Sequence, residues 1–222
     1  MTKLNLSRRT VVGGLAATGV ALTGGPGAAQ GAPVKVGELN SYSRMAAFAV
    51  PYRNGMQLAV EQINAAGGLT GMSGRPLEII YRDDGATPGD AVRVAEELVT
   101  RENVSFIAGA FLSNVGLALA DFANQKKVLY LATEPLTDAL TMASGNPYTF
   151  RVRPGTYMQT KMLVDAAKSK GIKRWAVVAP NYEYGQSAVA AFKRLMGAAV
   201  PGFEVVAEQF PALGRVDAGA TV

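Results

Sequence analysis

From residue 34 onward the chain alternates between short apolar segments and longer amphipathic segments, and this alternation restricts the possible folds more than any other feature. Runs rich in β-forming residues are followed by runs in which apolar residues recur at helical spacing. The expected strands are 34–39, 77–81, 104–108, 128–132, 175–179 and 203–207. The expected helical segments are 56–63, 91–99, 113–125, 157–168 and 187–196. Near-continuous apolar strands that alternate with helices predict an α/β fold with parallel sheets covered on both faces.

The alternation is interrupted once, which predicts two lobes. It pauses at residues 144–147, where Ser-Gly-Asn-Pro marks a turn, and restarts after an extended segment. We therefore expect a first lobe at 33–147, a crossover hinge at 148–153 and a second lobe at 154–222. Only two clear strands follow the crossover, too few for a sheet with both faces covered. The second lobe is expected to be incomplete.

The first 32 residues have the organisation of a bacterial export signal. The pair Arg8-Arg9 precedes a stretch from Thr10 to Val34 that contains no charged residue, with small residues before a cleavage point between Ala29 and Ala32. Paired arginines are typical of twin-arginine signals. The alternative, a transmembrane anchor, needs about 20 uninterrupted apolar residues, and this run is shorter and broken by glycines. We expect a soluble, exported protein that works in the periplasm and has no stable membrane insertion after cleavage.

Composition excludes several classes of function. Three of the 22 basic residues precede residue 33, so the rest of the chain carries 19 basic and 17 acidic residues. That near-balance of charge argues against nucleic-acid binding, which needs clustered positive charge. Cysteine and histidine are absent, which rules out a Ser-His-Asp triad, a Cys-His pair and the usual zinc sites. We expect a binding protein without cofactor or metal, not an enzyme.

Several short motifs together resemble one family. In chain order they are Arg53-Asn54-Gly55, Glu61-Gln62-Ile63-Asn64-Ala65-Ala66-Gly67-Gly68, Tyr81-Arg82-Asp83-Asp84, Gly109 with Ser113, Tyr148-Thr149-Phe150-Arg151 and Tyr184-Gly185. Their order and spacing resemble periplasmic solute-binding proteins of the leucine/isoleucine/valine type, which serve ATP-binding-cassette (ABC) importers. The resemblance implies two doubly wound parallel-sheet lobes that close on a small ligand, often an amino acid, and an ABC permease as partner. Members of this family are longer, so the resemblance also implies that this chain is truncated at its C-terminus.

Candidate ligand contacts in the first lobe follow expected strands. Ser113 stands where a strand gives way to a helix, and free N–H groups at a helix N-terminus attract carboxylates. The resemblance gives Ser113 a ligand contact, while the alternative is that it only caps its helix. Glu134, Pro135 and Leu136 follow the strand at 128–132, at the sheet edge where open α/β folds bind ligands. Glu134 departs from the small residues of the branched-chain type; it could accept an ammonium or amide N–H, or it could point at solvent.

Aromatic residues complete the expected site. The resemblance places Tyr184 on the ligand from the second lobe and Phe48 in a loop of the first lobe, with Tyr42 as its rival. Asp83 and Asp84 look like a paired-carboxylate site, but we expect them to end a strand, with one of them bracing the loop that follows.

The predicted function is capture of a small polar metabolite and its delivery to a permease. An exported sensor domain of the same fold is the alternative. Ser144, Tyr157 and Lys161 reproduce the spacing of short-chain reductases, a third and remote option. Such enzymes need a glycine-rich turn after the first strand, and residues 40–44 contain no glycine.

Overall fold

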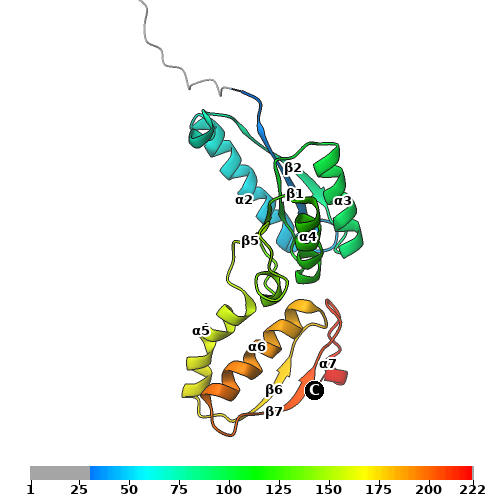
Figure 1. Cartoon of the computed structure of the whole chain (residues 1–222). Helices are drawn as coiled ribbons and strands as arrows, with labels where there is room; N and C mark the ends of the chain where they lie inside the picture. The colour runs from blue at the N-terminus through cyan, green and yellow to red at the C-terminus, as the bar shows by residue number, and fades with distance from the viewer. Residues whose placement is uncertain (1–30, 222) are drawn as a thin grey trace, which may run out of the picture.

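A five-stranded parallel sheet forms the first lobe in the computed structural model, which describes residues 31–221 (Figure 1). Its strands are β1 (Val34–Asn40), β2 (Leu77–Asp83), β3 (Phe106–Gly109), β4 (Tyr130–Ala132) and β5 (Thr149–Arg151). The strand order is β2-β1-β3-β4-β5, so the chain reverses its direction of winding at β1. Open α/β sheets bind ligands at such a reversal, beyond the carboxyl ends of the strands. Residues 148–153, which were expected to form the crossover, contain β5, and β5 forms one edge of this sheet.

Helices cover both faces of this sheet. Helix α2 (Ala46–Ala65) lies against one face, and α3 (Pro88–Thr100) and α4 (Ser113–Lys126) lie against the other (Figure 1). Two short 3-10 turns, η1 (Thr70–Met72) and η2 (Asp138–Leu140), complete the lobe. Between α3, α4 and the sheet, Leu98, Ile107 and Leu119 are fully buried. Each such side chain contributes roughly 1.5–3 kcal/mol relative to exposure, so this layer fixes the carboxyl ends of the strands.

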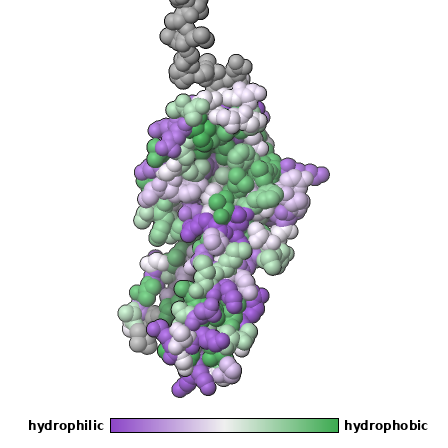
Figure 2. Space-filling model, turned by 90° about the vertical axis from the view of Figure 1, so that its left-hand side faces the viewer, coloured by the Kyte–Doolittle hydropathy of each residue, from purple (hydrophilic) through white to green (hydrophobic). Residues whose placement is uncertain are grey.

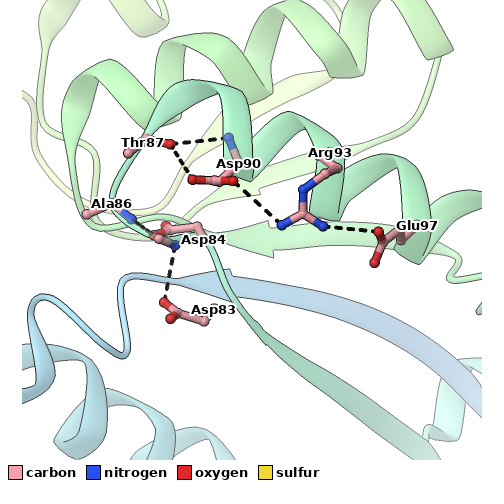
Figure 3. Close-up of polar contacts among 8 residues, drawn as sticks. Asp83, Asp84, Ala86, Thr87, Asp90, Arg93 and Glu97 are labelled. Carbon is pink, nitrogen blue, oxygen red and sulfur yellow. Dashed lines mark hydrogen bonds and ion pairs between the residues drawn. The ribbon is translucent and has the colours of Figure 1, made fainter.

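Side-chain contacts at Thr87 define the start of α3, three residues before the expected helical segment at 91–99. Thr87 is the N-cap: its Oγ1 accepts the Asp90 N–H at 3.2 Å and donates to the Asp90 carboxylate at 2.9 Å. Pro88 follows as the first helical residue, where its missing N–H costs nothing. Figure 3 shows the polar contacts continuing along the helix surface, from Asp90 to Arg93 and from Arg93 to Glu97.

Helix α2 begins much earlier than the apolar pattern predicted. The pattern placed a helix from Met56, but the helix starts at Ala46 and contains Pro51. The first two turns have no polar–apolar alternation to reveal them, and only Ala49 of the whole helix is buried. Phe48 therefore lies in the first turn of a helix and not in a loop, which corrects our expectation.

The second lobe contains α5 (Thr156–Ser169), β6 (Arg174–Val178), α6 (Glu183–Ala199), β7 (Glu204–Gln209) and the short α7 (Ala218–Thr221). Strands β6 and β7 pair in parallel and form the whole of its sheet within residues 31–221. Val164, Leu195 and Met196 are its buried core. The α/β fold with parallel sheets and an incomplete second lobe is confirmed.

Much apolar surface remains exposed on both lobes. On α5, Met162 and Leu163 are 69% and 67% exposed, and on β6 Val178 is 59% exposed. Figure 2 shows hydrophobic areas on the side of the molecule that carries α2 and α5. None of the helices within residues 31–221 has the length and apolarity needed to cross a membrane. The expected export signal lies almost wholly outside the described residues.

Candidate functional site

A cavity of about 370 Å³ lies where the two lobes meet. Its lining residues come from α2, from the carboxyl ends of the first-lobe strands and from the start of α6; they are Phe48, Phe111, Ser113, Glu134, Leu136, Arg153, Tyr182 and Tyr184. The structure thus brings together five of the six residues singled out from the sequence. The sixth, Pro135, is not in the lining, and it packs so closely on Gly116 that a Cβ there would lie 2.5 Å from its ring.

A larger cavity of about 560 Å³ lies within the second lobe, among α5, β6 and α6. Its walls are mostly apolar, with Leu163, Trp175 and Phe192 among them. We place the candidate site in the smaller cavity because polar groups from both lobes converge on it.

Ser113 organises the loop that forms one wall of the site. It is the first residue of α4, and Leu112, not Ser113, is the N-cap. Its Oγ accepts the backbone N–H groups of Leu136 and Thr137, both at 3.2 Å. The alternative that Ser113 only caps its own helix is therefore wrong. A hydroxyl that accepts two hydrogen bonds still has its own proton to donate, and the first N–H groups of α4 favour an anion at this point.

Glu134 presents an open acceptor. One carboxylate oxygen, Oε1, forms an ion pair with Arg153 at 3.4 Å, and the side chain is only 15% exposed. The other oxygen, Oε2, is buried without a hydrogen-bond partner. Burial raises the pKa of Glu134, while the charge of Arg153 and a hydrogen bond with the Asn40 side chain oppose that rise.

Two aromatic pairs form the apolar walls. Phe48 stacks on Phe111 with ring centroids 5.0 Å apart, and both rings belong to the first lobe. Tyr182 and Tyr184, at the start of α6 in the second lobe, have centroids 6.0 Å apart. Phe48 remains 57% exposed although it stacks on Phe111. The cavity therefore combines flat apolar surfaces with polar groups at its ends.

Sequence reasoning missed three lining residues, namely Phe111, Arg153 and Tyr182. Phe111 and Tyr182 each stand two residues before a predicted contact, at the carboxyl end of a strand. Their position at the carboxyl edge of a sheet was the one sequence feature that could have identified them as cavity residues. Arg153 had no such signal, because its role depends on the ion pair with Glu134.

Hydrogen bonds join the loop at residues 136–138, which Ser113 holds in place, to the second lobe. Thr137 Oγ1 donates to Glu183 Oε1 at 2.6 Å, and the Asp138 N–H donates to Ser187 Oγ at 3.2 Å. Ser187 Oγ also lies 2.6 Å from Thr156 Oγ1. Because Glu183 precedes Tyr184, these contacts lie beside the second-lobe wall of the cavity.

Tyr42 and the acidic pair lie outside the cavity. Tyr42 donates its hydroxyl to Glu38. Asp84 Oδ1 accepts from Ser41 Oγ at 2.7 Å and from the Ala86 N–H at 2.8 Å. Asp83 Oδ1 accepts the backbone N–H of Gly85, which lies in the same loop (Figure 3). The expectation that this pair braces the loop after β2 is confirmed.

The reductase-like residues have ordinary structural contacts. The ring of Tyr157 packs on the Arg194 guanidinium, 4.7 Å away, and its backbone N–H donates to Asp138 at 2.9 Å. Within residues 31–221, acidic side chains form no cluster suited to a metal ion.

The model of one protein family, described as "Periplasmic binding protein", matches residues 33–222. The chain belongs to the periplasmic binding protein family. A curated relative of this periplasmic binding protein is the Leu/Ile/Val-binding protein homolog 6 of Brucella abortus. It is 29% identical over 118 residues, which are 53% of this chain and 30% of the relative.

Solved structures show the same fold. A solute-binding protein of an ABC transporter from Rhodopseudomonas palustris, in complex with 3,4-dihydroxybenzoic acid, has a TM-score of 0.73 and 28% identity; the match covers 83% of this chain and 49% of that one. A branched-chain amino acid transporter substrate-binding protein from Streptococcus pneumoniae, in complex with isoleucine, has a TM-score of 0.72 and 26% identity, over 85% and 52% of the two chains. This periplasmic binding protein spans about half the length of these structures.

Proposed function

We propose that this periplasmic binding protein captures a small carboxylate-bearing metabolite, an amino acid or a related acid, outside the cytoplasm and delivers it to an ABC permease. The observation that carries the proposal is the cavity itself, because its walls come from both lobes. A ligand that touches both walls stabilises the closed arrangement by contacts that the open arrangement lacks. No bond is made or broken in this cycle.

The chemistry of the cavity favours a carboxylate at one end. Ser113 and the N-terminus of α4 offer donors there, while Phe48 and Tyr184 offer apolar faces for the body of the ligand. The Rhodopseudomonas and Streptococcus proteins support this, since dihydroxybenzoic acid and isoleucine both carry a carboxylate. We propose the periplasm as the location on the basis of the uncharged segment after Arg8-Arg9.

The domain division also remains our proposal. We propose a lobe at 33–147, a hinge at 148–153 and a partial lobe at 154–222, in which β5 of the hinge segment pairs with the edge of the first-lobe sheet. The two lobes would then close by a hinge motion in the segment after β5, which includes Arg153.

A ligand screen tests the proposed function. Amino acids, amides and small aromatic acids are added to the purified protein, and the shift of the melting temperature is measured. At least one carboxylate should raise it, because a ligand that binds only the folded state stabilises that state. A panel in which no member raises the melting temperature would count against the function.

A matched pair of variants then locates the site. Tyr184→Ala removes an aromatic wall and should weaken the best ligand about tenfold, since aromatic pairing and ring burial together exceed roughly 1.4 kcal/mol. Tyr157→Ala removes a tyrosine of the first turn of α5 that does not line the cavity, and it should leave affinity unchanged. Parent-like binding by Tyr184→Ala would show that the ligand sits elsewhere.

A further inference from the structure

Glu38 is a buried carboxyl group of the first lobe that does not line the cavity. It lies on β1, and its side chain is 0% exposed. Because β1 pairs with both neighbouring strands, Glu38 lies between Tyr81 of β2 and Ala108 of β3. Burying a carboxylate is costly, so the contacts of this group show what it does in the fold.

One carboxyl oxygen of Glu38 holds the loop between β1 and α2. Its Oε2 accepts the hydroxyl of Tyr42, a residue of that loop. The loop continues directly into the helix: the Met45 N–H donates to the Ser41 carbonyl at 2.8 Å, and the Phe48 N–H donates to the Met45 carbonyl at 2.9 Å. The contact with Tyr42 therefore fixes the segment from which Phe48 enters the cavity.

The other carboxyl oxygen faces the turn at the end of β3. A Cβ at Gly109 would lie only 2.8 Å from Glu38 Oε1, and Gly109 has a φ of +110°. The next N–H, that of Ala110, donates to the Leu39 carbonyl at 2.7 Å. Phe111 follows and lines the cavity. The backbone thus turns toward the site directly against the Glu38 carboxyl group.

The two segments that Glu38 contacts meet in the wall of the cavity, where Phe48 stacks on Phe111 with ring centroids 5.0 Å apart. We propose that Glu38 is a positioning residue of the binding site, which holds these two rings in place through Tyr42 and Gly109 while it carries a proton, and that loss of this proton weakens ligand binding. The part that concerns affinity rests on the proposed function.

The environment of Glu38 keeps the proton bound at neutral pH. Burial is the main cause that raises the pKa of Glu38 from 4.5 to about 8; Asp84 adds to the rise, while Tyr42, Asn40 and Arg53 oppose it. The chain contains neither histidine nor cysteine, the side chains that ordinarily titrate between pH 6 and 9. A transition near pH 8 therefore points to an unusual group.

Titratable and charged side chains face Glu38 from the elements packed around it. They are Tyr42 and Asp84 from loops, Tyr52 and Arg53 from α2, Tyr81 from β2 and Tyr130 from β4. Burial raises the pKa of each of these tyrosines above 10, so they stay protonated up to pH 9. Burial also raises the pKa values of Asp84 and of Glu134 in the cavity, so variants must separate their titration from that of Glu38.

The sign of the coupling follows from charge. The proposed function places the ligand carboxylate near Ser113, four residues after Gly109. A second negative charge close to Glu38 raises the pKa of Glu38 further. Binding then takes up protons, and affinity for a carboxylate falls as the pH rises past about 8. A rise of about 0.5–1 in that pKa on binding corresponds to about a 3- to 10-fold change in affinity.

NMR titration of the ligand-free full chain tests the positioning role. The ring signals of Phe48 and Phe111 should shift together between pH 6 and 10, with a midpoint near 8. Glu38→Gln keeps an acceptor for Tyr42 and should abolish the shift. Tyr42→Phe should move the midpoint upward, because the hydrogen bond of Tyr42 opposes the rise in the pKa of Glu38. Glu97→Gln, on the exposed surface of α3, is the control and should behave like the parent.

Calorimetric titration with benzoate and with 4-methylpentanoate tests the effect on binding, because both probes remain anions from pH 6 to 9. Affinity of the parent should fall about 3- to 10-fold over this range at constant stoichiometry, which excludes unfolding as the cause. Titrations at pH 8 in two buffers of different ionisation enthalpy should show uptake of a fraction of a proton. Glu38→Gln should remove both effects.

Several results would overturn the proposal. Ring signals that do not shift, or that shift equally in Glu38→Gln, would show that Glu38 does not position Phe48 and Phe111. Affinity that is independent of pH, or that falls equally in Glu38→Gln, would show that its proton is not coupled to the ligand. If no carboxylate of the ligand screen binds, the proposed function fails, while the ring signals still decide whether Glu38 positions the cavity wall.

Discussion

Replacing Glu38 with glutamine should remove much of the pH dependence of stability between about pH 5 and 8. Glu38 lies on β1 and is 0% exposed. Its Oε2 accepts the Tyr42 hydroxyl, and its Oε1 has no partner. Burial is the main cause that raises the pKa of Glu38 from 4.5 to about 8, against the opposing effects of Tyr42 and Asn40.

The sign follows from proton counts. Between pH 4.5 and about 8 the unfolded chain has lost the Glu38 proton while the folded chain keeps it. The unfolded state then binds fewer protons, so the free energy of unfolding falls as the pH rises. The slope is about 1.4 kcal/mol per pH unit, or on the order of 4 kcal/mol across the window. Asp84 and Glu134, whose pKa values burial also raises, act in the same direction.

Thermal unfolding followed by circular dichroism at pH 5, 6, 7 and 8 measures this effect. The parent should be most stable at pH 5, and Glu38→Gln should show a clearly smaller loss toward pH 8. Glu97→Gln is the control, because Glu97 is exposed on α3 and pairs only with Arg93; it should keep the parent slope. A parent whose stability is flat or rises from pH 5 to 8, or a Glu38→Gln slope equal to that of the parent, would refute the reasoning.

Three further predictions concern the helices and the N-terminus. Thr87→Ala removes the N-cap of α3 and should lower the free energy of unfolding by about 1 kcal/mol, measured by urea titration, while Thr87→Ser should restore most of it. Gly116→Ala places a Cβ 2.5 Å from the Pro135 ring and should cost about 1–3 kcal/mol, whereas Gly89→Ala meets nothing within 4 Å and should not destabilise the protein. Replacing Arg8 and Arg9 with lysine should block export in fractionated cells if the signal is of the twin-arginine type; unchanged export would favour the general secretory route.

Six of the seven strands within residues 31–221 were predicted, because each is a short, mainly apolar run between polar turns, as at Leu77–Asp83. The seventh, β5 (Thr149–Arg151), was expected as part of an extended crossover. The apolar pattern placed α2 too late, because residues 46–50 are apolar without a helical period and Pro51 follows. The helix forms there through its position against the sheet, which no local pattern encodes.

Within the site, the chain order showed which residues stand at strand ends but not what they touch. Ser113 was placed correctly at the start of a helix, yet its hydroxyl binds the N–H groups of Leu136 and Thr137, more than twenty residues away.

A crystal structure of the protein with its tightest-binding carboxylate tests the central claim most directly. We expect the ligand in the cavity between the lobes, with its carboxylate in hydrogen-bond distance of Ser113 Oγ and its body between Phe48 and Tyr184. A ligand bound instead in the apolar cavity among α5, β6 and α6 would contradict the account.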